Sequence, residues 1–192
     1  MGYVLTTNKK QGASKNFSER RFMNILTTQD MRHLMVRTGM GVRWQDLKHY
    51  QSSTKTASVR QIVYGANKQW TLPTPALMGW HTWNRKHTPQ QRKKLHYRLN
   101  NDKQLLKQWQ VQMLLRTPHP LIERMVLFWH NHFTTSINKI NQPSLLLKQN
   151  ILFRQQGLGN FKQLLHAVTR DPAMLIYLDN HTSKVGRPNE NF

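Results

Sequence analysis

Apolar side chains recur along this sequence at intervals of three and four residues, the spacing that places them on one face of an α-helix. Residues 28–38 show this pattern first. The region from Pro89 to Arg116 repeats it, with Asn100–Asn101 as a candidate break and a buried stripe expected at Leu95, Leu99, Leu106, Trp109 and Met113. No run alternates apolar and polar residues over the length of a β-strand. The sequence therefore predicts an all-α protein, an irregular multi-helix domain.

Residues that favour helix ends punctuate the pattern. Thr88, Pro89 and Gln91 have the spacing of a capping box with proline at the first helical position. Asp171 before a proline is typical of another N-cap. We expect residues 1–27 to form a flexible basic arm and residues 28–192 to form a single helical domain.

The region between residues 68 and 87 lacks helical periodicity and contains Pro73, Pro75 and three tryptophans. It is expected to be a loop, because proline interrupts helices and glycine and proline mark turns. We expect its tryptophans to pack on the helical body, and stacking of nucleic-acid bases is the alternative.

The charge is strongly unbalanced, with 29 Lys and Arg against 8 Asp and Glu, a formal net charge of +21. Such a field attracts nucleic acid, anionic membrane surfaces or acidic polysaccharides. The alternative is a solvated surface without a ligand. The excess is greatest over residues 85–107, where the candidate polyanion-binding residues are Arg85, Lys86, Arg92, Lys93, Lys94 and Arg98.

Composition also excludes several classes of protein. The chain has no cysteine, which rules out disulfides and zinc sites built from thiolates. No apolar run approaches the roughly 18 residues of a transmembrane helix. The N-terminal residues lack the apolar segment of a secretory signal, which favours a cytoplasmic location.

The densest apolar run, residues 121–133, carries His130 and His132. On a helical wheel His132 falls inside the apolar arc, and we expect it to be buried. His130 falls at the edge of the arc, close to Glu123. An imidazole oriented by a carboxylate suits acid–base catalysis or a single metal bond. The alternatives are a hydrogen-bonded core histidine at 132 and a surface ion pair between His130 and Glu123.

Two further acids flank the loop that carries His181, and they could complete a site around these histidines. The catalytic candidates are His130, Glu123 and Glu190, and the metal candidates are His130, His132 and Asp179. With few carboxylates in the chain, a divalent metal ion would have few other oxygen ligands. One hypothesis is therefore a metal-binding or hydrolase-like enzyme with its site near His130. The alternatives are a polyanion- or nucleic-acid-binding module that uses residues 85–107 and a structural fragment without independent activity.

Several longer motifs resemble one bacterial family. Residues 31–41, MRHLMVRTGMG, resemble its opening motif HLL-x-R-x-G-F-G, and residues 109–133 resemble a block that ends in ERM-x-LFWHNHF. The segments 158–161, 171–180 and 186–192 follow in the same order. Over residues 28–192 the chain thus resembles the domain of unknown function 1800 family.

The resemblance implies a large all-helical fold and no particular reaction. Members of the family continue after the Asn-Glu-Asn-Phe motif with a further helix, so we expect a truncated chain whose domain is incomplete at its C-terminus. Members are often encoded beside a sulfatase-like protein, which the resemblance implies as a partner. Some members are exported, which counts against the cytoplasmic expectation.

Overall fold

The computed structural model describes residues 25–50, 53–67, 71–80 and 87–191. In these ranges the regular structure is helical apart from two isolated bridges, which confirms the all-α prediction. The chain divides into two compact units, residues 1–64 (unit 1) and residues 65–192 (unit 2). Most of the expected N-terminal arm lies outside the described residues.

Unit 1 contains α2 (Thr28–Thr38), α3 (Trp44–His49) and most of α4 (Lys55–Ala66). A capping box starts α2: Thr27 Oγ1 accepts from the backbone N–H of Asp30, and Asp30 Oδ2 accepts from the backbone N–H of Thr27. The Thr27 hydroxyl also donates to Asp30 Oδ2 at 2.8 Å, and this hydrogen bond and the one from the Thr27 N–H lower the pKa of Asp30. Met31 is the buried residue of α2.

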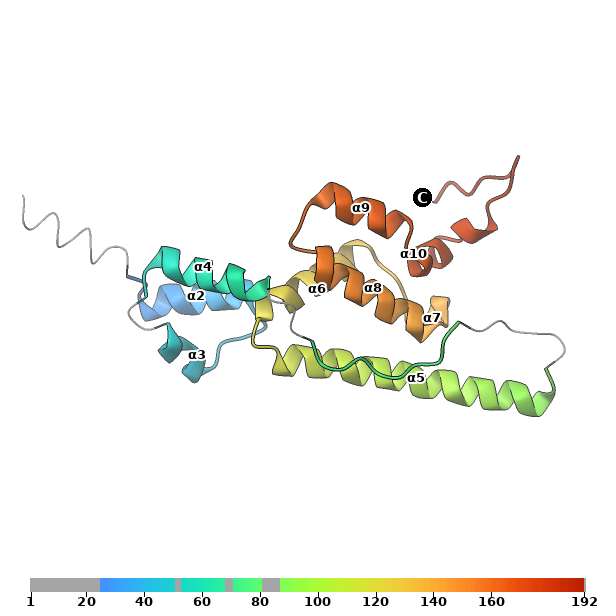
Figure 1. The fold of residues 1–192 in the computed structure, drawn as a ribbon, viewed down its shortest axis with the longest axis horizontal. Helices are drawn as coiled ribbons and strands as arrows, with labels where there is room; N and C mark the ends of the chain where they lie inside the picture. Colours follow the sequence, from blue (N-terminus) through green and yellow to red (C-terminus); the bar gives the residue numbers. More distant parts are fainter. Residues whose placement is uncertain (1–24, 51–52, 68–70, 81–86, 192) are drawn as a thin grey trace, which may run out of the picture. The chain divides into compact units, whose positions relative to one another are not determined.

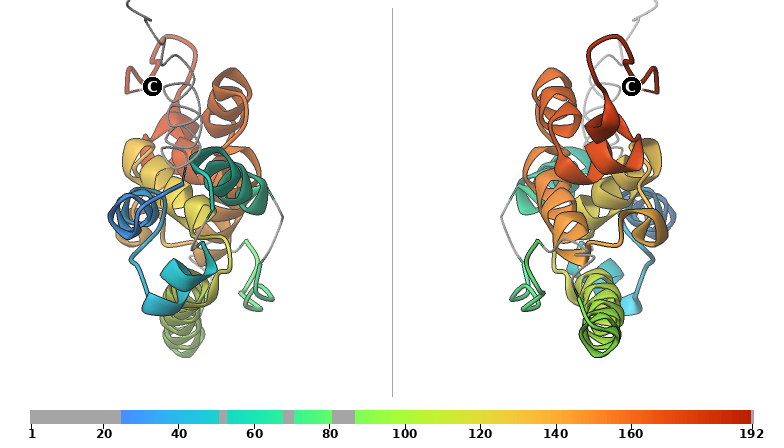
Figure 2. Two further views of the ribbon diagram at one scale, coloured as in Figure 1. Left: turned by 90° about the vertical axis from the view of Figure 1, so that its left-hand side faces the viewer. Right: turned by 90° about the vertical axis from the view of Figure 1, so that its right-hand side faces the viewer.

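Unit 2 contains the longer helices, which Figures 1 and 2 show from three sides. They are α5 (Pro89–Arg116), α6 (Pro120–His132), α7 (Ile137–Ile140), α8 (Pro143–Gln156), α9 (Phe161–Thr169), α10 (Pro172–Tyr177) and the 3-10 helix η1 (Asn180–Thr182). Helix α8 is the central element, since it contacts α5, α6, α7, α9 and α10.

Two apolar clusters form the core of unit 2. One joins Leu106, Trp109 and Met113 of α5 to the leucines at the start of α8. The other joins Val126 of α6 to Phe153 of α8 and to apolar residues of α9 and α10. Because α8 contributes to both clusters, it holds the basic helix α5 and the histidine-bearing helix α6 in one unit.

Helix α5 runs without interruption for 28 residues, and the pair Asn100–Asn101 does not break it. It begins with the predicted capping box at Thr88. Leu99, Leu106, Trp109 and Met113 of the predicted stripe are buried, and Leu95 is half-buried. The expected pattern of this helix is confirmed.

The described part of the loop, residues 71–80, runs alongside α5 (Figure 1). Its backbone makes two polar contacts with α5: the N–H of Met78 donates to Asp102 Oδ2 at 2.8 Å, and the N–H of Leu72 lies 3.3 Å from Met113 Sδ. The side chains of Leu72 and Leu77 pack against the first apolar cluster. Trp80 is 61% exposed, so the expected anchoring by tryptophan is wrong at this position. Trp70 and Trp83 lie outside the described residues.

Candidate polyanion-binding surface

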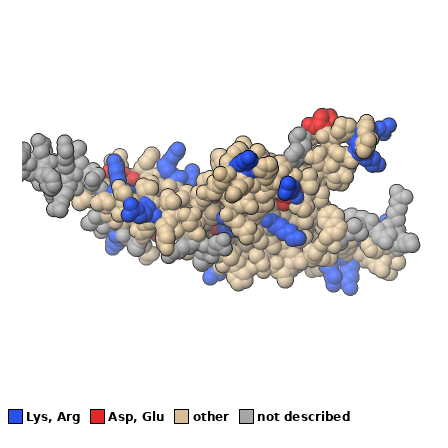
Figure 3. All heavy atoms as spheres, turned by 45° about the horizontal axis from the view of Figure 1, so that its top comes forward, with Lys and Arg blue, Asp and Glu red and all other residues tan. Residues whose placement is uncertain are grey.

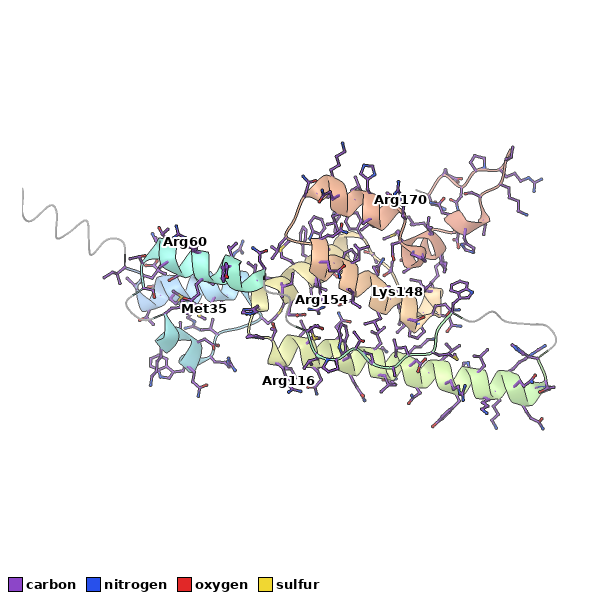
Figure 4. All side chains as sticks on the ribbon, in the orientation of Figure 1. Met35, Arg60, Arg116, Lys148, Arg154 and Arg170 are labelled. Atoms are coloured by element: carbon purple, nitrogen blue, oxygen red, sulfur yellow. The ribbon has the colours of Figure 1, made fainter. Side chains whose placement is uncertain are left out.

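Glu123 of α6 is the most deeply buried acid among the described residues, with 1% of its surface exposed. Both of its oxygens accept from Arg154 of α8, one of them at 2.7 Å. Arg154, labelled in Figure 4, also donates to Asn150 Oδ1 at 3.0 Å and lies over the ring of Trp109. The expected surface pair between Glu123 and His130 is therefore wrong, because Arg154 takes both carboxylate oxygens.

His132 is exposed, contrary to the prediction that it is buried. Helix α8 packs against α6, and Ile122, Glu123 and Val126 are the buried residues of α6. His132 lies near the other end of the arc, where its ring is parallel to that of the exposed Phe128 with centroids 6.2 Å apart. The apolar arc is wider than the surface that one neighbouring helix covers.

His130 is half-buried, and burial lowers the pKa of its imidazole, so the neutral form is favoured. A neutral imidazole can accept a proton or bind a metal. The two other acidic candidates do not join it in a cluster of ligands. Asp179 forms an exposed ion pair with Lys139 at 2.7 Å, and Glu190 is exposed in the C-terminal loop.

In the part of the chain that the structure describes, no three His, Asp or Glu side chains are close enough together to hold a metal ion. The metal candidates His130, His132 and Asp179 are thus not brought together there. A catalytic role for His130, Glu123 or Glu190 stays a prediction, as does a divalent metal.

A buried series of hydrogen-bonded polar side chains runs through unit 2, and the sequence did not predict it. Thr135 Oγ1 donates to Gln149 Oε1 at 2.6 Å, and Gln149 Nε2 donates to Asp171 Oδ2 at 2.7 Å. Asp171 also accepts from the backbone N–H of Met174, which confirms its predicted role as an N-cap. Burial raises the pKa of Asp171, and these hydrogen bonds oppose the rise. This series joins α8 to the start of α10 and serves the fold.

Helix α5 is the most cationic helix that the structure describes. It carries one acid, Asp102, which is buried and bonded to the backbone of Met78. Its seven cations are solvent-accessible and are Arg92, Lys93, Lys94, Arg98, Lys103, Lys107 and Arg116. On the face drawn in Figure 3, Lys and Arg atoms also clearly outnumber Asp and Glu atoms. The positive charge of α5 is therefore not neutralised by an acid on its own surface.

A cleft of about 350 Å³ opens between α5 and α7. Its wall combines cations, amides and one aromatic ring: Tyr97, Asn100, Asn101, Lys103, Gln104, Lys107, Ile137 and Asn138. Tyr97 is 75% exposed. Several of the α5 residues of this wall lie three or four positions apart, and together they occupy the side of the helix that the buried stripe leaves open.

The predicted polyanion-binding residues Arg92, Lys93, Lys94 and Arg98 are exposed in the first turns of α5. Arg85 and Lys86 lie outside the described residues. The cleft residues Lys103 and Lys107 fall in the predicted basic region but were not singled out, and Tyr97 and the amides were missed. Their helical spacing was visible in the sequence, whereas the second wall of the cleft comes from α7, some 30 residues away along the chain.

The fold and this surface define an all-helical protein with a cationic helix bordering a polar cleft. No helix among the described residues has the length and apolar character needed to cross a membrane. Residues 33–192 match the model of the family described as "Protein of unknown function (DUF1800)". The chain belongs to this family, as its sequence motifs predicted. No curated protein and no solved structure was found to match the chain.

Proposed function

We propose that this protein binds a polyanion through the cationic surface of α5. The observation that carries the proposal is the charge balance of this helix: seven accessible cations and one acid, which is buried. Cations that approach phosphate or sulfate groups release condensed counterions, and this release favours binding at low salt. The four exposed cations of the first turns supply a continuous basic segment.

The packing of α5 supports the same role. Its buried stripe holds it against α8, so the cationic side faces solvent on a rigid element instead of a loop. A rigid helix presents several cations together without the entropy loss that a flexible basic segment incurs on binding. The net charge of +21 adds a long-range attraction that increases the rate of encounter.

The test measures binding of the full chain to heparin and to a labelled oligonucleotide over a range of salt concentrations. We expect the logarithm of the binding constant to fall linearly with the logarithm of the salt concentration. The triple variant K93Q/K94Q/R98Q should weaken binding and reduce the slope by about one for each phosphate that the variant no longer neutralises.

The matched control is K162Q/R170Q/K184Q, which removes the same charge from exposed positions outside α5. It should lower affinity much less than the α5 variant, because only the general field changes. Equal reductions in affinity for the two triple variants would show that α5 is not a specific surface. Absent binding at low salt would refute the proposal altogether.

A further inference from the structure

We infer that the cleft between α5 and α7 binds a nucleobase and its phosphate, so that the polyanion is single-stranded nucleic acid. This inference rests on the proposed polyanion-binding function and names its ligand. The cleft offers the three kinds of group that such a ligand requires: an exposed ring, side-chain amides and cations.

The exposed ring is Tyr97, of which three-quarters of the surface is accessible (75%). The Tyr97 side chain contributes little to the core, since the buried stripe of α5 lies on another side of the helix. An aromatic ring that stays in solvent beside cations provides a face on which a base can stack.

The amides come from both walls of the cleft. Asn100, Asn101 and Gln104 lie on α5, and Asn138 lies on α7. Each amide offers a donor and an acceptor, the combination that the edge of a base presents. The Asn100 amide nitrogen lies 3.0 Å from His96 Nε2, so that a neighbouring side chain holds this amide. A membrane surface would not need such a set of paired donors and acceptors.

The cations of the cleft are Lys103 and Lys107, one helical turn apart on α5. Residues separated by four positions lie on the same side of a helix, so both ammonium groups can reach one backbone segment. The volume of about 350 Å³ is that of a small-molecule cleft, which suits one nucleotide unit. A paired base inside a duplex would not expose its face to Tyr97, and this favours a single strand.

The experiment compares a labelled oligothymidylate with an abasic oligomer of the same length, measured by fluorescence anisotropy with the full chain. Tyr97→Ala should weaken oligothymidylate binding about tenfold, the effect of removing one stacked base, and leave abasic binding unchanged. Tyr97→Phe keeps the ring and should retain most of the affinity. Phe128→Ala removes a half-exposed ring on α6 and should have no effect.

The double variant K103Q/K107Q should weaken the binding of both oligomers, because it removes the cations that face the phosphates. Equal affinities for the two oligomers together with an unaffected Tyr97→Ala variant would overturn the nucleobase site. The proposed polyanion function would then survive through heparin binding. Stronger binding to phosphatidylserine vesicles or heparin than to oligothymidylate would also overturn the inference. If neither heparin nor an oligonucleotide binds, both proposals fail together. If heparin binds but the base makes no difference, only the nucleobase site fails.

Discussion

Glu123 on α6 and Arg154 on α8 form a bidentate ion pair inside unit 2, with 1% and 9% of their side chains exposed. Arg154 also contacts Asn150 and stacks over Trp109 of α5, with 5.4 Å from its Cζ to the ring centroid. One guanidinium thereby connects three helices. This pair decides which side of α6 faces inward, because the carboxylate is stable in the interior only beside its partner.

Replacing one member of this pair should strongly destabilise the protein. Glu123→Gln leaves the guanidinium of Arg154 buried without its counter-charge, and we expect the free energy of unfolding to fall by about 3–5 kcal/mol. Denaturation in urea, followed by circular dichroism, measures the change. The double variant E123L/R154M should recover much of the stability, since it leaves no unpaired charge.

The exposed pair between Lys139 and Asp179 is the control for this prediction. Lys139→Gln should cost less than about 1 kcal/mol, as is usual for solvent-exposed ion pairs. A comparable destabilisation at the two pairs would contradict the structural role given to Glu123 and Arg154.

Gly157 follows α8 at a point where no side chain fits. A Cβ atom there would clash with the backbone oxygen of Phe153 and lie 2.8 Å from Trp129 Cδ1. Gly157→Ala must also disturb the hydrogen bond from Trp129 Nε1 to the Gly157 oxygen, which measures 2.7 Å. We expect a destabilisation of about 1–3 kcal/mol in a thermal unfolding experiment. Gly79→Ala, with nothing within 4 Å of the added atom, should be neutral or slightly stabilising.

Asp171 should make stability depend on pH in the acidic range. Burial raises its folded-state pKa above the ordinary 3.8, so the folded protein holds the proton more tightly than the unfolded chain. Its contribution to stability is greatest below pH 3.8 and is lost as the pH rises through the raised pKa. Asp171→Asn stays neutral and can still accept from Met174 and Gln149.

The stability of Asp171→Asn relative to the original protein should therefore rise from pH 3.8 upward and then level off. Urea unfolding at a series of pH values measures this difference. A difference independent of pH would contradict the prediction. Asp171→Ala is the control for the cap itself and should cost about 0.5–2 kcal/mol.

His130 should produce a dependence in the opposite direction. Burial lowers its folded-state pKa below the ordinary 6.5, so the unfolded chain takes up the proton first as the pH falls. The stabilising contribution of neutral His130 is complete above pH 6.5 and is lost as the pH falls through the lowered pKa. The stability advantage of the original protein over His130→Gln should therefore shrink as the pH falls from 6.5 through the lowered pKa. An NMR titration of the His130 ring with a midpoint above 6.5 would refute the lowered pKa.

The sequence by itself was enough to predict most local structure. The capping box at Thr88, the buried stripe of α5 and the N-cap at Asp171 depend on residues within one or two helical turns, and all three are confirmed. The family motifs over residues 33–192 were also readable without coordinates. Helix propensity, caps and apolar spacing are local properties, so the sequence carries them directly.

The tertiary structure alone decided which faces of the helices are covered and which polar groups meet. The apolar arc of α6 places His132 inside and Glu123 outside, whereas the position of α8 with Arg154 determined that Glu123 is buried and His132 exposed. The cleft beside Tyr97 likewise exists only because α7 lies next to α5. Such contacts join residues some 30 positions apart, and a spacing pattern within one helix does not specify the helix that packs against it.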